Sequence, residues 1–322
     1  MGDYRKIFLI LDPSRPRSPA FHRAVELART AGASLHLGLY EHPPAIPALG
    51  LANRAVTEQA RGAWRAEREH WLDGIARELM AEGVDATSEV ESRTPAHETI
   101  AERILELAPD LVLKDVQHES TLSRVLFTPF DAHLLRLCPA PLLLVTGRHE
   151  RRPRRVIAAV DTLHADEVSG LNDRIVTEAR RLARMFEATV HLVHVFEGLP
   201  PPTAGMIEGL DGLGVAYDQL AQTDRERFEV FARHHGFPAE RGHLLSGFGP
   251  ATLAEFAGDA TADLLVLGTN YRTGLDRLLV GSTAERLLGL VRCDVLAVHP
   301  EGFEADLARH LGLKPRATRR AA

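Results

Sequence analysis

Segment 268–285, GTNYRTGLDRLLVGSTAE, has the glycine and hydroxyl content of an anion-binding loop. An apolar run precedes it and a helical pattern begins near its end. Gly268 and Gly281 allow backbone conformations and close approaches that a side chain would prevent. Ser282 and Thr283 would place hydroxyls and N–H groups at a helix N-terminus, where anions bind readily. The segment therefore predicts a phosphate-binding loop, although Ser or Thr before a helix is also an ordinary N-cap.

The elements that would position this loop belong to a unit that the chain contains twice. Residues 108–145 align with residues 261–298 without a gap, and the strand-like openings RKIFLILDPS and RRVIAAVDTL set Asp12 opposite Asp161. In each half, short apolar strands alternate with amphipathic helices in the order β-α-β-α-β-α-β-α-β. Such alternation predicts a parallel sheet with helices on both faces. We therefore expect α/β architecture in two tandem doubly wound sandwiches of five strands each.

Domain boundaries follow from the same pattern. We expect a first domain over residues 1–147, a basic linker over 148–155, a second domain over 156–300 and a tail over 301–322. The linker and the tail are rich in arginine, and solvated segments usually have this composition.

Composition limits the classes of function. The chain has 322 residues, 45% hydrophobic and 25% charged, as in soluble globular proteins. Its net charge of −6 argues against broad nucleic-acid binding, and no apolar run approaches the ~20 residues of a membrane span. Two cysteines cannot form a disulfide framework, which favours a reducing, cytoplasmic location.

The second half, with VIAAVD, VHLVHVFE, DLLVLGTN and LLVGSTAERLL, resembles the universal stress proteins. The tandem layout and the strings DLVLK and FTPFDAHLLRLCP in the first half resemble the two-domain, E-type members. The resemblance spans roughly residues 4–300 and implies two adenine nucleotide alpha hydrolase-like sandwiches with a binding or regulatory role in stress survival. ATP-binding members share a signature of Gly, two residues, Gly, nine residues, then Gly-Ser/Thr.

Site residues also follow from this resemblance. It implies that Asp161 hydrogen-bonds the adenine–ribose end of a nucleotide and that Val195 and Leu267 line the adenine pocket. ATP is the expected cofactor, with magnesium only where ATP is bound. The last strands, PLLLV and DVLAV, are expected to pair in an internal pseudo-dimer that covers their edges, and a homodimer of the whole chain stays open.

Tyr271 departs from the family pattern, because it occupies the place of the second glycine. If the loop needs a positive φ there, a tyrosine carries a penalty of roughly 1–2 kcal/mol. If the glycine lets a phosphate approach the backbone, the ring stands in the way. Arg272 could still reach a phosphate. Both readings stay open: a re-formed nucleotide loop, or a site for a different ligand.

The first domain has lost the signature. Asp115 stands at the first glycine position, and Thr128-Pro129 replaces Gly-Ser. A carboxylate repels phosphates, and proline donates no N–H. Of the expected nucleotide contacts only Asp12 remains, so we expect no ATP in this degenerate cleft. Lys114 ends an apolar strand and is expected to have a structural role in which it neutralises Asp115 next door, with a different anionic ligand as the alternative.

Other chemistry has little support in the residues. His191 and His194 are three apart on an expected strand and point to opposite faces, so we expect no shared metal ion. Cys138 and Cys293 lie in apolar surroundings and are expected to be buried, inert thiols. No Gly-x-Ser-x-Gly elbow occurs, so no enzyme is predicted.

Three functions remain. The first is a nucleotide-dependent sensor using the second domain. The second is a sensor or carrier of a non-nucleotide small or amphipathic ligand in the first-domain cleft. The third is a slow nucleotide hydrolase, although the sequence offers no evident general base.

Overall fold

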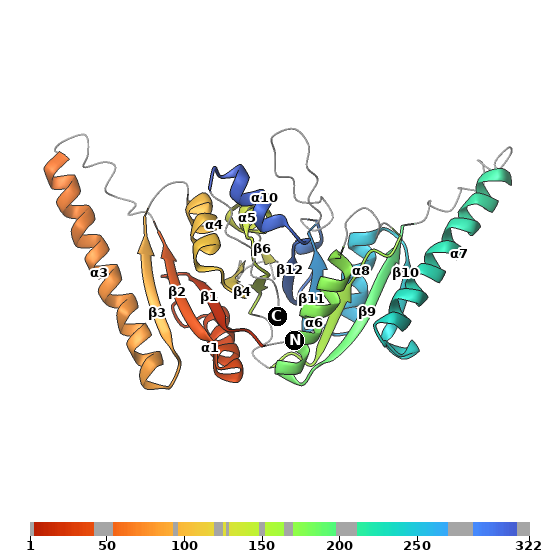
Figure 1. The fold of residues 1–322 in the computed structure, drawn as a ribbon, viewed down its shortest axis with the longest axis horizontal. Coiled ribbons are helices and arrows are strands. Elements are labelled where there is room, and N and C mark those ends of the chain that lie inside the picture. Colours follow the sequence, from red (N-terminus) through yellow and green to blue (C-terminus); the bar gives the residue numbers. More distant parts are fainter. Residues whose placement is uncertain are drawn as a thin grey trace. The chain divides into compact units, whose positions relative to one another are not determined.

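The computed structural model describes residues 3–41, 54–92, 96–118, 125–126, 129–147, 152–163, 170–197, 211–269 and 286–313. Figure 1 labels most of the helices and strands. Contacts divide the chain into two compact units. Unit 1 comprises Met1–Val116, Pro129–Gly147 and Gly302–Ala322, and unit 2 comprises Gln117–Thr128 and Arg148–Glu301.

Unit 1 contains a parallel sheet of five strands within its described residues, in the order β3-β2-β1-β4-β7. The strands are β1 (Lys6–Leu11), β2 (Ser34–Tyr40), β3 (Ala86–Glu91), β4 (Leu111–Asp115) and β7 (Leu142–Val145). The helices are α1 (Pro19–Ala31), α3 (Arg54–Ala81), α4 (Ala96–Leu107), α5 (Pro129–Leu137) and α10 (Phe303–His310). The segment that we expected as a tail thus contributes a helix, which contacts α4.

Unit 2 repeats this sheet in the order β10-β9-β8-β11-β12, again with parallel neighbours. The strands are β8 (Arg155–Ala159), β9 (Thr189–Phe196), β10 (Gly242–Ser246), β11 (Leu264–Gly268) and β12 (Asp294–Val298). The helices are α6 (Leu171–Phe186), α7 (Asp211–His234), the short 3₁₀ helix η1 (Ala239–Arg241) and α8 (Gly249–Asp259). A small antiparallel ladder joins β5 (Gln117–His118) and β6 (Val125–Leu126). The predicted α/β fold, with a five-stranded doubly wound sheet in each half, is confirmed.

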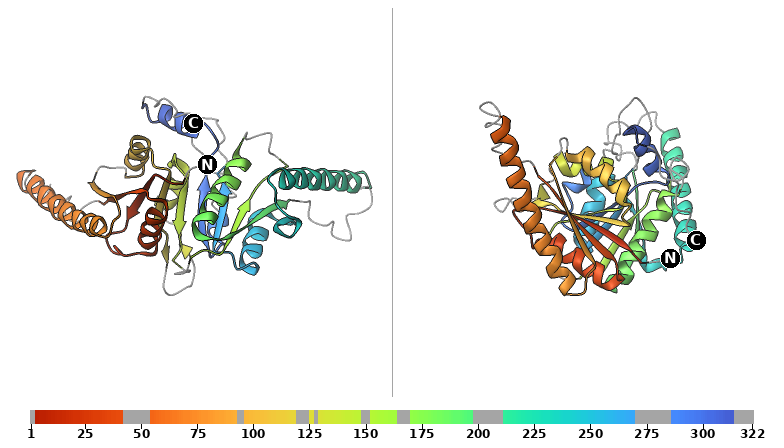
Figure 2. Two further views of the ribbon diagram at one scale, coloured as in Figure 1. Left: turned by 60° about the horizontal axis from the view of Figure 1, so that its bottom comes forward. Right: turned by 60° about the vertical axis from the view of Figure 1, so that its left-hand side comes forward.

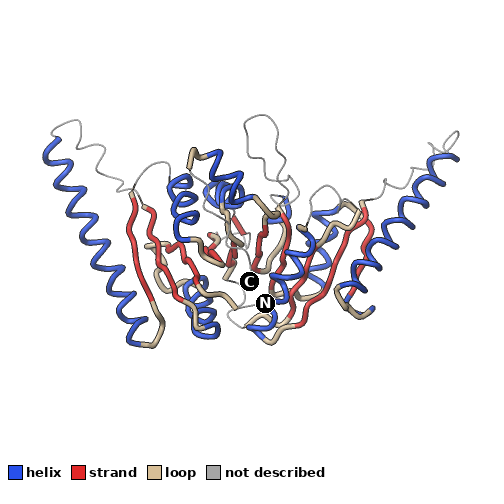
Figure 3. Tube along the Cα trace, viewed as in Figure 1, coloured by secondary structure: helices blue, strands red, loops and turns tan. Residues whose placement is uncertain are grey.

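The sequence accounts for these elements locally. Most residues of β1, β4, β8 and β12 are buried, as expected for parallel strands covered on both faces. Figure 3 shows the strands and the helices of each unit in separate colours. Helix α1 begins at Ser18, whose side chain accepts the N–H of Phe21, and Pro19 fits the first turn. It ends at Gly32, which has φ +63°.

Helices α3 and α7 are longer than the strands that they follow. Helix α3 buries Leu72, Ile75 and Leu79 near its C-terminal end, and residues 55–71 are largely exposed. Figures 1 and 2 show this N-terminal part extending past β3. None of the helices in the described ranges has the length and apolar character needed to cross a membrane.

Candidate functional site

The expected adenine-binding residues of unit 2 meet at one end of its sheet. Asp161 follows β8, Val195 lies near the end of β9, and Leu267 and Gly268 end β11. Strand β8 lies between β9 and β11, so the carboxyl ends of three adjacent parallel strands bring these four residues together. In open α/β sheets this end is where ligands bind.

The turn that carries Asp161 is fixed through its backbone. The Asp161 N–H donates to Asn172 Oδ1 at 3.0 Å, and Asn172 Nδ2 donates to the Asp161 carbonyl at 2.7 Å. The Asp161 side chain is exposed. Asn172 belongs to α6, so this helix holds the backbone of the turn that follows β8.

Gly268 has a packing role that its place in the signature did not predict. A Cβ there would lie 2.7 Å from Leu171 Cδ2, closer than real Cβ contacts allow, and 3.1 Å from Ile175 Cδ1, which is an unusually tight contact. Both neighbours belong to α6. The absent side chain therefore lets α6 approach the end of β11, whatever the glycine also does for a ligand.

The expected phosphate-binding part of the site lies outside the described residues. This holds for Tyr271, Arg272, Gly281, Ser282 and Thr283. Their roles, and the effect of Tyr271 on the loop, therefore stay predictions.

In unit 1 the residue equivalent to Asp161 is engaged locally. The Asp12 carboxylate accepts the Ser14 N–H at 2.9 Å and the Ser14 hydroxyl at 2.6 Å. This is the hydrogen-bond pattern by which aspartate stabilises a turn. Both bonds go to Asp12 Oδ1, so this oxygen already accepts hydrogen bonds from within unit 1.

Asp115, opposite Gly268 in the repeat, binds the N-terminus of α1. Its carboxylate accepts the Ser18 hydroxyl and, at 2.9 Å, the Ala20 N–H. Burial raises the pKa of Asp115, although these hydrogen bonds partly oppose that change. An internal carboxylate thus supplies the negative charge that a helix N-terminus favours.

Lys114 pairs within unit 1. Its ammonium donates to Asp131 Oδ1 at 2.7 Å and to the Asp115 carbonyl at 2.8 Å, and it lies 5.4 Å from the centre of the Phe130 ring. Asp131 is fully buried, so this pair compensates a charge that would be costly alone. The partner that Lys114 meets is the Asp131 carboxylate, which lies in the first turn of α5.

The structure also shows a polar cavity in unit 1 that the sequence did not indicate. Its volume is about 460 Å³. Its polar lining consists of Tyr40 of β2, Arg65, Glu69 and Asp73 of α3, Ser88, Glu89 and Glu91 of β3, and Thr99, Arg103 and Glu106 of α4. Asp12, Lys114 and Asp115, the residues of the expected cleft, are not among them. A pocket of this size can hold a small molecule.

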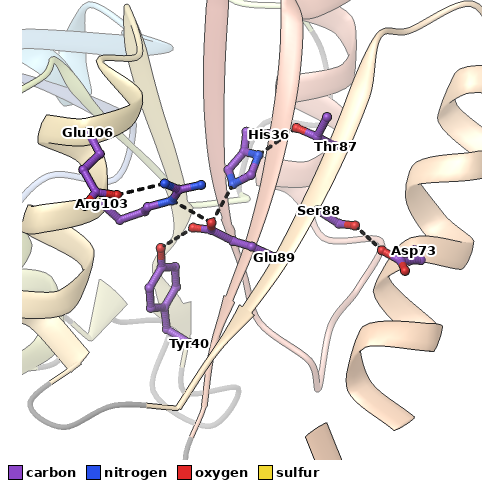
Figure 4. Close-up of polar contacts among 8 residues, drawn as sticks. All are labelled: His36, Tyr40, Asp73, Thr87, Ser88, Glu89, Arg103 and Glu106. Carbon is purple, nitrogen blue, oxygen red and sulfur yellow. Dashed lines mark hydrogen bonds and ion pairs between the residues drawn. The ribbon is translucent and has the colours of Figure 1, made fainter. Parts of the chain in front are cut away.

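Glu89 is the centre of the polar network beside this cavity (Figure 4). It accepts the Tyr40 hydroxyl at 2.8 Å and Arg103 Nε at 2.6 Å, and His36 Nε2 lies 3.3 Å away. Burial alone would raise the pKa of Glu89, but the hydrogen bonds and charges of His36, Tyr40 and Arg103 lower it. Arg103 also donates to Glu106 at 2.9 Å. Glu89 is therefore held as a carboxylate.

The other groups singled out in the sequence have structural surroundings. Cys138 and Cys293 are buried, which confirms the predicted burial, and burial raises the pKa of each thiol to about 12. His191 Nδ1 lies 3.0 Å from Nε2 of His243 in β10, whereas His194 Nε2 contacts the carboxylate of Asp224 in α7. Within the described ranges, no three His, Cys, Asp or Glu side chains are placed to hold a metal ion.

Comparisons with known proteins agree with this architecture. A sequence model described as the universal stress protein family matches residues 3–146 and 153–299. Universal stress protein E of Escherichia coli K12 is 27% identical over 311 residues, covering 95% of this chain and 98% of that protein. Universal stress protein A homolog 1 of Coxiella burnetii is 32% identical over 146 residues, covering 45% of this chain and 95% of that protein.

Two solved structures share the fold along nearly the whole chain. A functionally unknown protein from Pseudomonas aeruginosa PAO1 has a TM-score of 0.76 at 24% identity, covering 96% of this chain and 97% of that one. A universal stress protein from Archaeoglobus fulgidus has a TM-score of 0.61 at 15% identity, covering 91% and 98%. At these identities the likeness concerns the fold alone.

Proposed function

Because this chain belongs to the universal stress protein family as a tandem, E-type member, we propose that its unit 2 binds an adenine nucleotide. The site is the carboxyl end of β8, β9 and β11. On this proposal the protein acts in the stress response by binding a ligand and signalling its presence, without catalysis. Its location is the cytoplasm, where its two free cysteines stay reduced.

One observation carries the proposal: residues from three strands converge at this end of unit 2. Val195 is partly buried and can offer apolar surface to a base, and Leu267, which is 5% exposed, lies in the apolar layer at the same end of the sheet. Asp161 is exposed beside them and can accept hydrogen bonds from ribose hydroxyls. The phosphates would then meet the predicted loop with Arg272, Gly281, Ser282 and Thr283, and magnesium would enter only with ATP.

Unit 1 is proposed not to bind ATP. Asp115 occupies the position equivalent to Gly268, and its carboxylate already bonds to Ser18 and Ala20 at the N-terminus of α1. A triphosphate brought to this place would meet a negative charge in partly buried surroundings, where repulsion is screened less than in water.

Binding of a fluorescent ATP analogue tests the proposal. Asp161→Ala should weaken binding about tenfold, because it removes a charged hydrogen-bond acceptor. Asp12→Ala changes the equivalent residue of unit 1 and should leave the affinity unchanged. No saturation at millimolar analogue, or equal losses in the two variants, would contradict nucleotide binding in unit 2. A measured phosphate-release rate that Asp161→Ala leaves unchanged would dismiss the slow hydrolase.

A second function, a sensor of a non-nucleotide ligand in unit 1, is supported by the polar cavity. The lining is mostly charged, so it fits a polar small molecule better than the amphipathic ligand expected from the sequence. Native mass spectrometry of the purified full chain should show a co-purifying small molecule. A Glu89→Gln, Arg103→Gln double variant should lose that molecule, and wild type that is free of any bound species would count against this function.

A further inference from the structure

Three arginines of unit 2 converge on one cavity of about 390 Å³, here called the basic cavity. Arg180 and Arg184 come from the C-terminal half of α6, and Arg241 comes from η1. Glu187 contributes the one carboxylate of the lining, and Phe237 is part of its apolar wall. The lining therefore carries two positive charges in excess, within a chain whose net charge is −6.

None of these three arginines has a carboxylate partner among the described residues. Arg180 donates to the His235 carbonyl and lies over the Phe237 ring at 4.8 Å. Burial and the neighbouring charge of Arg184 lower the pKa of Arg180. Within the described part of the chain, the guanidinium groups of Arg184 and Arg241 have no hydrogen bond or ion pair. Among the described residues, the three guanidinium groups thus line one cavity without an ion-pair partner, and Glu187 offsets only one of their charges.

Helix electrostatics explain only part of this arrangement. A cation in the last turn of a helix interacts favourably with the helix dipole, and Arg184 occupies the last turn of α6. Arg180 lies further from that end, and Arg241 belongs to another element. Like charges four apart on a helix, such as Arg180 and Arg184, destabilise it slightly.

The repeat shows that the fold does not require these charges. Helix α1 of unit 1 ends at Gly32, which aligns with the residue that ends α6. By this alignment Val25 stands at the place of Arg180, and Arg29 stands at the place of Arg184. Arg29 forms an ion pair with Glu82, so unit 1 neutralises the one arginine that it keeps here.

We propose that the basic cavity of unit 2 binds an oxyanion of the phosphate class through Arg180, Arg184 and Arg241. Planar guanidinium groups suit phosphate because two parallel N–H groups can meet two oxygens. The His235 carbonyl and the Phe237 ring hold Arg180 in place before the anion arrives, which lowers the entropic cost of binding.

This site is distinct from the proposed nucleotide site. Val190, which lines the basic cavity, begins the buried part of β9, whereas Val195 lies near the carboxyl end of the same strand. Five residues of extended strand span about 17 Å. An inorganic anion in the basic cavity therefore leaves the carboxyl end of the sheet open.

Calorimetric titration of the full chain with inorganic pyrophosphate at low ionic strength tests the proposal. Arg184→Gln and Arg241→Gln should each weaken binding about fivefold, and the double variant should weaken it further. Both side chains are exposed, so the fold should be kept. The matched control is Arg29→Gln, which removes the equivalent but paired arginine of unit 1 and should leave the affinity unchanged.

A variant that is expected to strengthen pyrophosphate binding completes the test. Glu187→Gln removes the negative charge of the lining and should strengthen pyrophosphate binding about twofold. The proposal is overturned if wild type shows no saturable binding, or if the double variant binds as wild type does. It also fails if Arg29→Gln weakens binding as much as Arg184→Gln.

Discussion

Replacing Gly268 by alanine separates the packing role of this residue from its expected role in a nucleotide loop. The new Cβ would lie 2.7 Å from Leu171 Cδ2 and 2.9 Å from Leu171 Cγ, with Ile175 Cδ1 at 3.1 Å. Leu171 is 9% exposed and Ile175 is 2% exposed, so neither side chain can turn into solvent at low cost. Helix α6 must move away from β11, and such overpacking costs about 1–3 kcal/mol.

Hydrogen exchange read by mass spectrometry is the suitable assay. Peptides from β8 and β11 report the opening of unit 2 around the mutated position. Both tryptophans, Trp64 and Trp71, belong to α3, so urea unfolding followed by tryptophan emission reports unit 1 separately. In Gly268→Ala the opening free energy of the β11 peptides should fall by about 2 kcal/mol.

Gly258→Ala is the matched control. Gly258 is an exposed residue of α8 in the same unit, and a Cβ there meets no atom within 4 Å. Alanine favours helix over glycine, so unit 2 should gain up to about 1 kcal/mol. The packing argument is refuted if hydrogen exchange of the β11 peptides is the same in Gly268→Ala as in wild type. If this variant also loses nucleotide binding, Gly268 acts in ligand binding instead.

Two further predictions concern buried carboxylates. Asp224→Ala should destabilise unit 2 by about 3–5 kcal/mol in hydrogen exchange, because it leaves the buried His194 ring without its carboxylate. Asp218→Ala, on an exposed position of α7, should change stability by less than about 0.5 kcal/mol, and equal effects would contradict the pairing. Because burial raises the pKa of Asp115, the folded state keeps its proton to higher pH than the unfolded chain, so this carboxyl costs stability as pH rises above about 4. In urea unfolding between pH 4 and pH 7, the free energy of unfolding of wild type should therefore fall relative to that of Asp115→Asn. A rise of the wild-type free energy relative to that of the variant over this range would contradict the prediction.

The sequence determined the duplicated fold, because its signals are local or periodic. Runs such as IFLIL of β1 and LLVL of β11 are apolar at every position, which is typical of a sheet covered on both faces. Ser18, Pro19 and Gly32 set the ends of α1 through interactions within a few residues. The same local signals occur in both halves, and the resemblance to the universal stress proteins implied that Asp161, Val195 and Leu267 belong to one site.

Tertiary structure decided which charges have partners, since these contacts join residues far apart in the chain. Glu89 meets Tyr40 of a neighbouring strand and Arg103 of a later helix, a combination that no spacing rule predicts. Asp115 looked like a lost phosphate contact, and the structure shows it at the N-terminus of α1. Arg184 and Arg29 look alike in the sequence, and only the folded chain shows that Arg29 pairs with Glu82 whereas Arg184 has no ion pair among the described residues.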